Sequence, residues 1–163
     1  MISIVGIDPG LAATGVAVVS GSGLTVARYA YGMVRTSPQS GLSERLNKIY
    51  MEISDFLADQ KPSLMVIEDV FSLEKYPKSG ITLGQVSGVI LLAGCRKQIP
   101  VVQVPVREAK QILTGNGNAG KQQLEESVRR RLNHPVPIRP YHSADALSMA
   151  LIGLFRWSGN HQK

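Results

Sequence analysis

Three of the twelve acidic residues in this sequence stand where a carboxylate is costly unless it meets a cation. They lie at the end of the apolar run 2–7, at the end of the run 64–67 and at the start of the run 144–155, and they are Asp8, Glu68 and Asp145. An ionised carboxylate beside a hydrophobic core must be paired or must bind a metal. Carboxylates from separate elements can meet at one end of a sheet, and such oxygen ligands suit magnesium. Two magnesium ions can activate a water and stabilise the leaving oxygen of a phosphodiester.

Each acid also has a purely structural explanation. Asp8 precedes Pro9-Gly10 and could be a turn residue. Glu68-Asp69 could be the solvated end of a strand, and Asp145 could be a first-turn acid favoured by the helix dipole. Taken together, on a basic chain with few acids, the three favour a metal site. His142 could be a ligand or could deprotonate the attacking water, although its spacing alone favours a polar loop residue.

The net charge of +6 suggests a polyanionic partner, with nucleic acid ahead of an acidic membrane surface. Candidates for contacts to backbone phosphates are Arg107, Lys110, Lys121 and the run 129–131. The arginine run could equally be a solvated helix face.

A glycine-rich loop at 114–120 precedes Lys121 and could hold a phosphate through its backbone N–H groups. A plain flexible connector explains the loop about as well. Residues 115–121 fit the GxxxxGK part of a P-loop by spacing. However, Gln122 stands where the magnesium-binding Ser or Thr belongs, and a short helix is expected before the loop instead of a strand, so the sequence argues against a P-loop.

Phe71 opens a polar stretch three residues after Glu68. An apolar ring beside an active site could stack on a base or wedge between base pairs. The alternative is that the ring folds back into the core, and Tyr76 is open to the same two interpretations.

The elements expected to position these residues alternate between strands and helices. Apolar runs predict strands at 2–7, 14–20, 24–35, 64–67 and 101–104, and helical spacing predicts helices at 42–58, 81–98, 105–113, 121–132 and 143–157. The polar stretch 71–80 is expected to be a loop. Three glycines in the helix at 81–98 predict a close approach to a neighbouring helix or sheet. The element order predicts one α/β domain with a mixed sheet and helices on its faces.

The bulk composition fits a single globular domain at 1–157 with a polar tail at 158–163. No apolar run reaches the ~18 residues of a membrane span, and 86–93 is the longest candidate. Cys95 is expected to be a small buried residue on a helix, and a lone cysteine is compatible with a reducing cytosol. The N-terminus lacks the charged region of a signal peptide, so a cytoplasmic location is expected.

The full set of motifs resembles the RuvC-type Holliday-junction resolvases, which are crossover junction endodeoxyribonucleases. The opening motif alone also resembles sugar kinases and actin-like ATPases. The matching segments run in order along nearly the whole chain: Gly6-Ile7-Asp8-Pro9-Gly10, Ile67-Glu68-Asp69-Val70-Phe71, Val106 to Lys110 ahead of the glycine-rich loop and Lys121, and His142 to Leu147.

This resemblance implies a retroviral-integrase or RNase H-like fold with a five-stranded sheet, and a homodimer that includes the helix from Ile81. It implies paired, symmetric cuts in four-way junction DNA during recombination and repair, together with a branch-migration helicase complex of the RuvA and RuvB type. Two Mg²⁺ ions per subunit are expected, with Mn²⁺ able to substitute. The implied metal ligands are Asp8, Glu68, His142 and Asp145. Lys110, Lys121 and Phe71 match positions linked to DNA, and Lys121 is also expected to assist catalysis.

Three rival functions fit part of the sequence. An ATPase of the actin and sugar-kinase type needs two such domains, for which 163 residues are too few. A non-catalytic junction-binding module would share the fold and the basic face, but the three carboxylates argue against it. A related nuclease acting on RNA is not distinguished from a DNA nuclease by any residue of the sequence.

Overall fold

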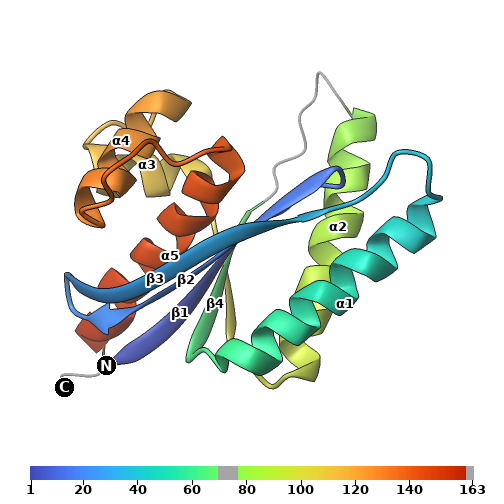
Figure 1. The fold of residues 1–163 in the computed structure, drawn as a ribbon, viewed down its shortest axis with the longest axis horizontal. Helices are drawn as coiled ribbons and strands as arrows, with labels where there is room; N and C mark the ends of the chain where they lie inside the picture. Colours follow the sequence, from blue (N-terminus) through green and yellow to red (C-terminus); the bar gives the residue numbers. More distant parts are fainter. Residues whose placement is uncertain (70–76, 161–163) are drawn as a thin grey trace.

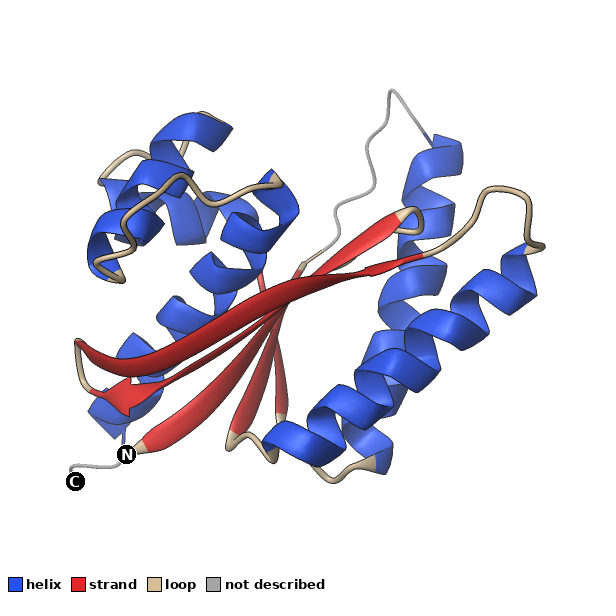
Figure 2. Ribbon diagram, viewed as in Figure 1, coloured by secondary structure: helices blue, strands red, loops and turns tan. Residues whose placement is uncertain are grey.

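The computed structural model describes residues 1–69 and 77–160, and within them strands and helices follow the predicted order (Figures 1 and 2). The strands are β1 (Ile2–Asp8), β2 (Ala13–Ser22), β3 (Thr25–Arg35), β4 (Leu64–Glu68) and β5 (Val101–Val104). The helices are α1 (Leu42–Gln60), α2 (Pro77–Arg96), α3 (Val106–Thr114), α4 (Lys121–Arg131) and α5 (Tyr141–Asn160).

The strands form one mixed sheet in the order β3-β2-β1-β4-β5. β1, β2 and β3 pair in antiparallel fashion, whereas β4 runs parallel to both β1 and β5. In this register Ile7 of β1 lies opposite Ile67 of β4. The last residues of these two strands, Asp8 and Glu68, therefore emerge at the same edge of the sheet.

Two helical layers cover the sheet, with α1 and α2 on one face and α5 on the other, and with α3 and α4 outside α5 (Figure 1). Successive side chains of a strand point to opposite faces, so each central strand contributes to both cores. In β1, Ile4 joins the core beneath α5, and Val5 and Ile7 join the core beneath α1 and α2. The predicted mixed sheet with helices on both faces is confirmed.

Two helices begin earlier than the sequence predicts. α2 starts at Pro77, so the predicted loop 71–80 is helical from Pro77 onward, and residues 71–76 lie outside the described residues. α5 starts at Tyr141, directly after Pro140, and therefore includes His142. Proline is well tolerated at the start of a helix, because its fixed φ suits the helix and its missing N–H would have no partner there.

Helix α2 departs from two further predictions. Cys95 is exposed instead of buried. By length and composition, Lys78–Arg96 could cross a membrane, and 28% of this stretch is buried. Core helices of soluble proteins pass the same test, so this finding alone does not place α2 in a membrane.

The close approach predicted from the glycines of α2 is confirmed at one of the three. A Cβ at Gly94 would lie 2.7 Å from the side chains of both Met65 and Val101 in the sheet. At Gly84 and Gly88 a Cβ would meet open space.

Candidate metal centre

Two glycines allow α5 to lie directly against the sheet. A Cβ at Gly6 would lie 2.1 Å from the backbone oxygen of Ala146, and one at Gly15 would lie 2.1 Å from the backbone oxygen of His142. No side chain tolerates so short a contact, so glycine is required where β1 and β2 meet this helix. The close approach sets the first turn of α5 beside the end of β1.

Three residues that the sequence singled out meet at this point. Asp8, His142 and Asp145 each offer a ligand atom, and these atoms all lie within 4.8 Å of one another. The Asp8 residue is 7% exposed, and its Oδ2 lies 2.6 Å from Nδ1 of His142. His142 thus belongs to a helix and faces a carboxylate, whereas its spacing alone favoured a polar loop residue.

Glu68 joins this group from the end of β4. Burial, followed by the charge of Asp8 and a hydrogen bond with it, raises the pKa of Glu68 from 4.5 to about 8. Asp145 adds to this effect, and the positive charge of Lys110 opposes it. A carboxyl kept protonated by burial and by neighbouring carboxylates becomes ionised when a cation binds beside it.

The two residues of α5 are perturbed in the same sense. Burial, and then the charge of Asp8, raises the pKa of Asp145 to about 6, against the opposing charges of Lys121, His142 and Lys110. The hydrogen bond to Asp8 raises the pKa of His142, although partial burial works against it. Besides burial and hydrogen bonding, the negative charge of Asp8 contributes to all three shifts, and a divalent cation would offset that charge. The carboxylate oxygens are ligands that fit Mg²⁺ or Mn²⁺, and the imidazole nitrogen is a softer ligand that suits transition metals better than Mg²⁺.

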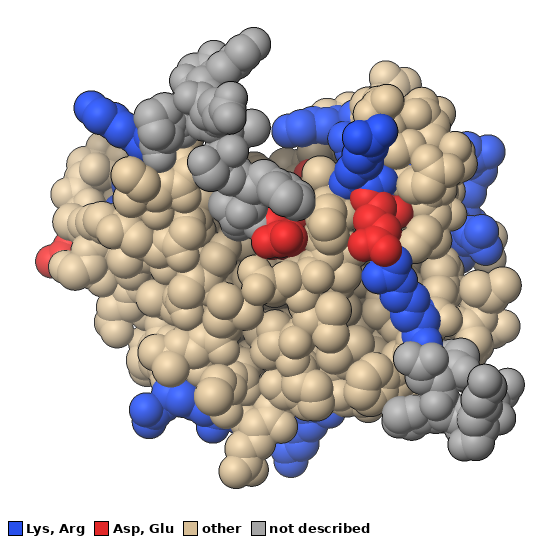
Figure 3. All heavy atoms as spheres, turned by 180° about the vertical axis from the view of Figure 1, so that it is seen from behind, with Lys and Arg blue, Asp and Glu red and all other residues tan. Residues whose placement is uncertain are grey.

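Two lysines stand close enough to affect these acids. Lys110, half-buried on α3, opposes the rise in the pKa values of Glu68 and Asp145. Lys121, the first residue of α4, opposes the rise in those of His142 and Asp145. In Figure 3 the surface is hollowed near the top of the view, and Lys and Arg side chains lie beside the hollow on the side of α3. The site therefore combines an acidic group with basic neighbours, which suits a metal-bound phosphate.

The loop between α3 and α4 is held by hydrogen bonds from a side chain of α3. Gln111 donates from Nε2 to the backbone oxygen of Gly115 at 3.0 Å and accepts the N–H of Gly117 at Oε1 at 2.9 Å. The side chain of Arg107, an exposed residue, lies against Gly117. A helix precedes this loop, which agrees with the argument against a P-loop. Sequence reasoning missed Gln111, which lies one helical turn before the loop glycine.

The arginine run splits into two kinds of residue. Arg129 turns inward, where its Nε lies 3.2 Å from Oε1 of the buried Glu125. Arg130 and Arg131 are exposed and line a cavity of about 400 Å³ between α3 and α4. Within the run 129–131, Arg130 and Arg131 remain candidates for phosphate contacts, alongside Arg107, Lys110 and Lys121 elsewhere. Phe71 and Tyr76, the two aromatic candidates, lie outside the described residues.

Comparisons with known proteins agree with one another. A family model for crossover junction endodeoxyribonuclease RuvC matches residues 4–153. The RuvC of Prosthecochloris aestuarii is 35% identical over 151 residues, covering 93% of this chain and 80% of that protein. The RuvC of Salinispora arenicola is 38% identical over 154 residues, covering 94% and 87%.

Solved structures give the same result. The structure of T. thermophilus RuvC in complex with Holliday junction substrate superposes with a TM-score of 0.90 at 30% identity, covering 98% of this chain and 97% of that one. The yeast mitochondrial Holliday junction resolvase Ydc2 has a TM-score of 0.61 at 11% identity, which shows a shared fold.

Proposed function

Because this chain belongs to the RuvC family of crossover junction endodeoxyribonucleases, we propose that it resolves Holliday junctions by paired, symmetric nicks during recombination and repair. Membership of the family and the RNase H-like fold, both expected from the sequence, are confirmed. The observation that carries the proposal is the meeting of Asp8, His142 and Asp145, with Glu68 beside them, at one edge of the sheet. The same observation favours a nuclease over a junction-binding module without activity.

The cofactor in this proposal is Mg²⁺, with two ions per subunit and with Mn²⁺ able to substitute. Asp8, Glu68, His142 and Asp145 would hold the ions, and the raised pKa values of Glu68 and Asp145 support this ligand set. When bound, such ions activate a water for attack and stabilise the leaving oxygen of a phosphodiester.

The side chains of the chain have separate tasks in this proposal. Asp8, the most central acid, orients His142 through the 2.6 Å contact between Oδ2 and Nδ1. Lys121 would offset the negative charge that grows on the phosphate in the transition state. Lys110 would neutralise charge beside Glu68, and it would bind the DNA backbone together with Arg107.

The DNA partner is a four-way junction. The basic side chains beside the hollow would bind backbone phosphates, which gives affinity without sequence information. Phe71 would stack on a base near the junction centre, as its match to the family motif suggests.

A homodimer is part of the proposal, because two symmetric nicks require two active sites. The exposed face of α2 supports it: Ile81 is 65% exposed, Leu92 is 50% exposed, and Gly84 and Gly88 leave open space between them. Small residues on such a face allow a second helix to approach closely. This interface also accounts for the apolar composition of α2 without a membrane. A cytoplasmic location, a helicase partner of the RuvA and RuvB type and a single nuclease domain at 1–157 complete the proposal.

The test is a cleavage assay on a labelled synthetic four-way junction and on a linear duplex of the same sequence. With Mg²⁺, the protein is expected to cut the junction at symmetric positions on two strands and to leave the duplex intact. Equal cutting of both substrates would reject junction selectivity, and binding without cutting in Mg²⁺ or Mn²⁺ would support a binding module.

A further inference from the structure

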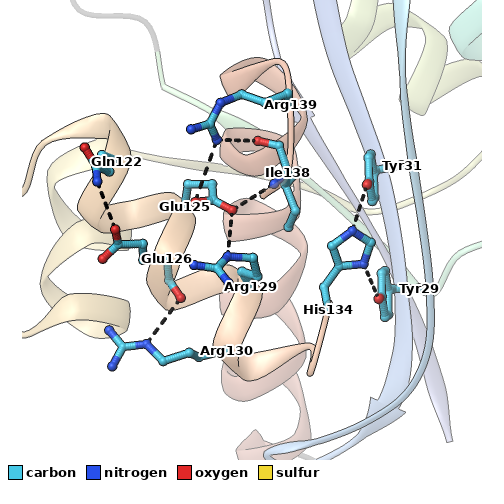
Figure 4. A network of polar contacts seen from close by, with 10 residues as sticks. All are labelled: Tyr29, Tyr31, Gln122, Glu125, Glu126, Arg129, Arg130, His134, Ile138 and Arg139. Carbon is cyan, nitrogen blue, oxygen red and sulfur yellow. Dashed lines mark hydrogen bonds and ion pairs between the residues drawn. The ribbon is translucent and has the colours of Figure 1, made fainter. Parts of the chain in front are cut away.

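The segment 132–140 joins α4 to α5 and leads directly into the turn that carries His142. Figure 4 shows this segment held at two points, one by α4 and one by β3. Neither contact touches the acidic group itself.

The attachment to α4 is a buried carboxylate. Glu125 is 2% exposed, and its Oε1 accepts the backbone N–H of Ile138 at 2.8 Å. Nε of Arg129 lies 3.2 Å from the same oxygen in an ion pair without hydrogen-bond geometry, and Nη1 of Arg139 lies 3.7 Å from Oε2. Because a buried charge is costly without partners, the contacts with Ile138 and Arg139 fix Glu125 and the segment to each other. The hydrogen bond from Ile138 is the shortest of the three contacts.

The attachment to β3 is a histidine between two tyrosines. Nδ1 of His134 lies 2.7 Å from the hydroxyl of Tyr29, and Nε2 lies 3.3 Å from the hydroxyl of Tyr31. Both ring nitrogens therefore have partners on the edge strand. This contact ties the beginning of the segment to the sheet, as the Glu125 contact ties its end to α4.

Both attachments lie close in sequence to residues of the metal centre. On one side, the guanidinium of Arg139 lies 4.3 Å above the ring of Tyr141, which directly precedes His142. On the other side, Glu125 follows Lys121 by four residues, so the two share one face of α4. Helix α4 thus supplies a basic residue of the site and also holds the segment that leads to His142.

We propose that Glu125 is a positioning residue for the metal centre. By accepting the Ile138 N–H, it fixes segment 132–140 and so sets the first turn of α5 relative to Lys121. Glu125 touches neither metal nor DNA and acts only through this segment. The inference rests on the proposed function, since it assigns Glu125 to that same site.

The test uses three variants of the full chain. Glu125→Met fills similar space and favours a helix, but it offers no oxygen to Ile138. Glu125→Gln loses the charge and keeps an acceptor oxygen. Glu126→Met makes the same change at the neighbouring position, where within the described part of the chain the side chain accepts a hydrogen bond from Gln122 alone, so it serves as the matched control.

Three quantities are measured for each variant: Mn²⁺ affinity of the DNA-free protein by calorimetry, junction affinity in a metal chelator, and the single-turnover cleavage rate at saturating protein. Residues that orient metal ligands indirectly are worth roughly tenfold to a hundredfold in affinity or activity. We therefore expect Glu125→Met to lose about tenfold in Mn²⁺ affinity and in rate, with junction affinity unchanged. Glu125→Gln should recover most of both, and Glu126→Met should match the wild type.

Wild-type Mn²⁺ affinity and rate in Glu125→Met would overturn the inference, as would an equal loss in Glu126→Met. If Glu125→Met fails to melt cooperatively, Glu125→Gln decides: its amide oxygen can still accept the Ile138 N–H, so a tenfold loss of Mn²⁺ affinity in this variant would overturn the inference. A wild-type protein that binds Mn²⁺ but leaves junctions uncut would reject the proposed function instead, and the Mn²⁺ titrations would still test Glu125.

Discussion

Helices α5 and α2 are both twenty residues long and both largely apolar, but they use their apolar side chains differently. From Ala144 to Leu154, α5 is buried at nearly every position, because the sheet lies beneath it and α3 and α4 lie over it. In contrast, α2 buries Val86, Ile90 and Ala93 and leaves Ile81 and Leu92 exposed. The hydrophobic residues of α5 between Ala144 and Leu154 are buried inside the chain beside the site, whereas the exposed ones of α2 remain available for association.

Glycine substitutions should separate the two helices most strongly. Gly6→Ala places a Cβ against the backbone of α5. This overpacking should lower the free energy of unfolding by about 3 kcal/mol or more. We expect a melting temperature lower by roughly 10 °C and a loss of metal binding. Gly88→Ala on α2 meets nothing within the chain and should melt at or slightly above the wild-type temperature. Thermal melts of the two variants at low protein concentration test this contrast, and a destabilised Gly88→Ala monomer would contradict it.

A charge on the exposed face of α2 should break the dimer and spare the fold. Leu92→Glu is expected to shift the sedimenting species from dimer to monomer, because the carboxylate would be desolvated in the interface. The melting temperature of the monomer should change by no more than a few degrees. Leu24→Glu, at a turn residue that is 68% exposed, is the control and should remain dimeric. A monomeric wild type, or a dimeric Leu92→Glu variant, would contradict a dimer interface formed by α2.

The closely spaced carboxyl groups near the start of α5, including Glu68, should make the folded protein less stable as the pH rises. The pKa of Glu68 rises from 4.5 to about 8 on folding, so the folded state binds more protons than the unfolded chain across this window. In a metal chelator, stability should therefore fall as pH rises from about 5 to 8, by roughly 5 °C in melting temperature. Glu68→Gln should flatten this decline, and Mg²⁺ should stabilise the wild type most at the alkaline end. A wild type and a Glu68→Gln variant with parallel pH profiles would contradict the shift.

The smallest effect is expected in the arginine run behind α5. Arg130→Gln and Arg131→Gln should each weaken junction binding uniformly and reduce the slope of log affinity against log salt by about one. Arg96→Gln, at the end of α2, has the same change of charge and serves as the control. Cleavage at saturating protein should stay at the wild-type rate in all three. An unchanged salt slope in Arg130→Gln and Arg131→Gln would show that these two side chains lie on a solvated helix face and do not contact phosphates.

Local patterns in the sequence predict the order of elements and the acids at the strand ends, because burial imposes a period on the residues of each strand and helix. They misplace the starts of α2 and α5, where Pro77 and Pro140 resemble helix breakers but stand at the beginning of a helix. They also predict the wrong environment for Cys95, since an apolar helix with one uncovered face has the same composition as a buried one.

Contacts between residues that lie far apart in the chain could not be predicted from the sequence. His134 meets Tyr29 across 105 positions in the sequence, and no spacing rule predicts such a pair. Glu125 looks like an ordinary surface acid on a polar helix, because its burial depends on Ile138 and Arg139 from a loop rich in proline. His142 required the resemblance to a family, since the spacing to Asp145 is informative only once the helix is known to begin at Tyr141.

The central claim is that the acidic group binds a divalent metal and that this metal drives junction cleavage. The most direct measurement compares Asp8→Asn with Asp69→Asn, an identical change at a half-buried acid one residue beyond Glu68, by Mn²⁺ calorimetry and junction cleavage on the same preparations. We predict that Asp8→Asn binds the junction, loses Mn²⁺ affinity and cuts at least about a thousandfold more slowly, a loss equal to about 4 kcal/mol of barrier. Asp69→Asn should behave as the wild type. Undiminished cutting by Asp8→Asn would contradict the account.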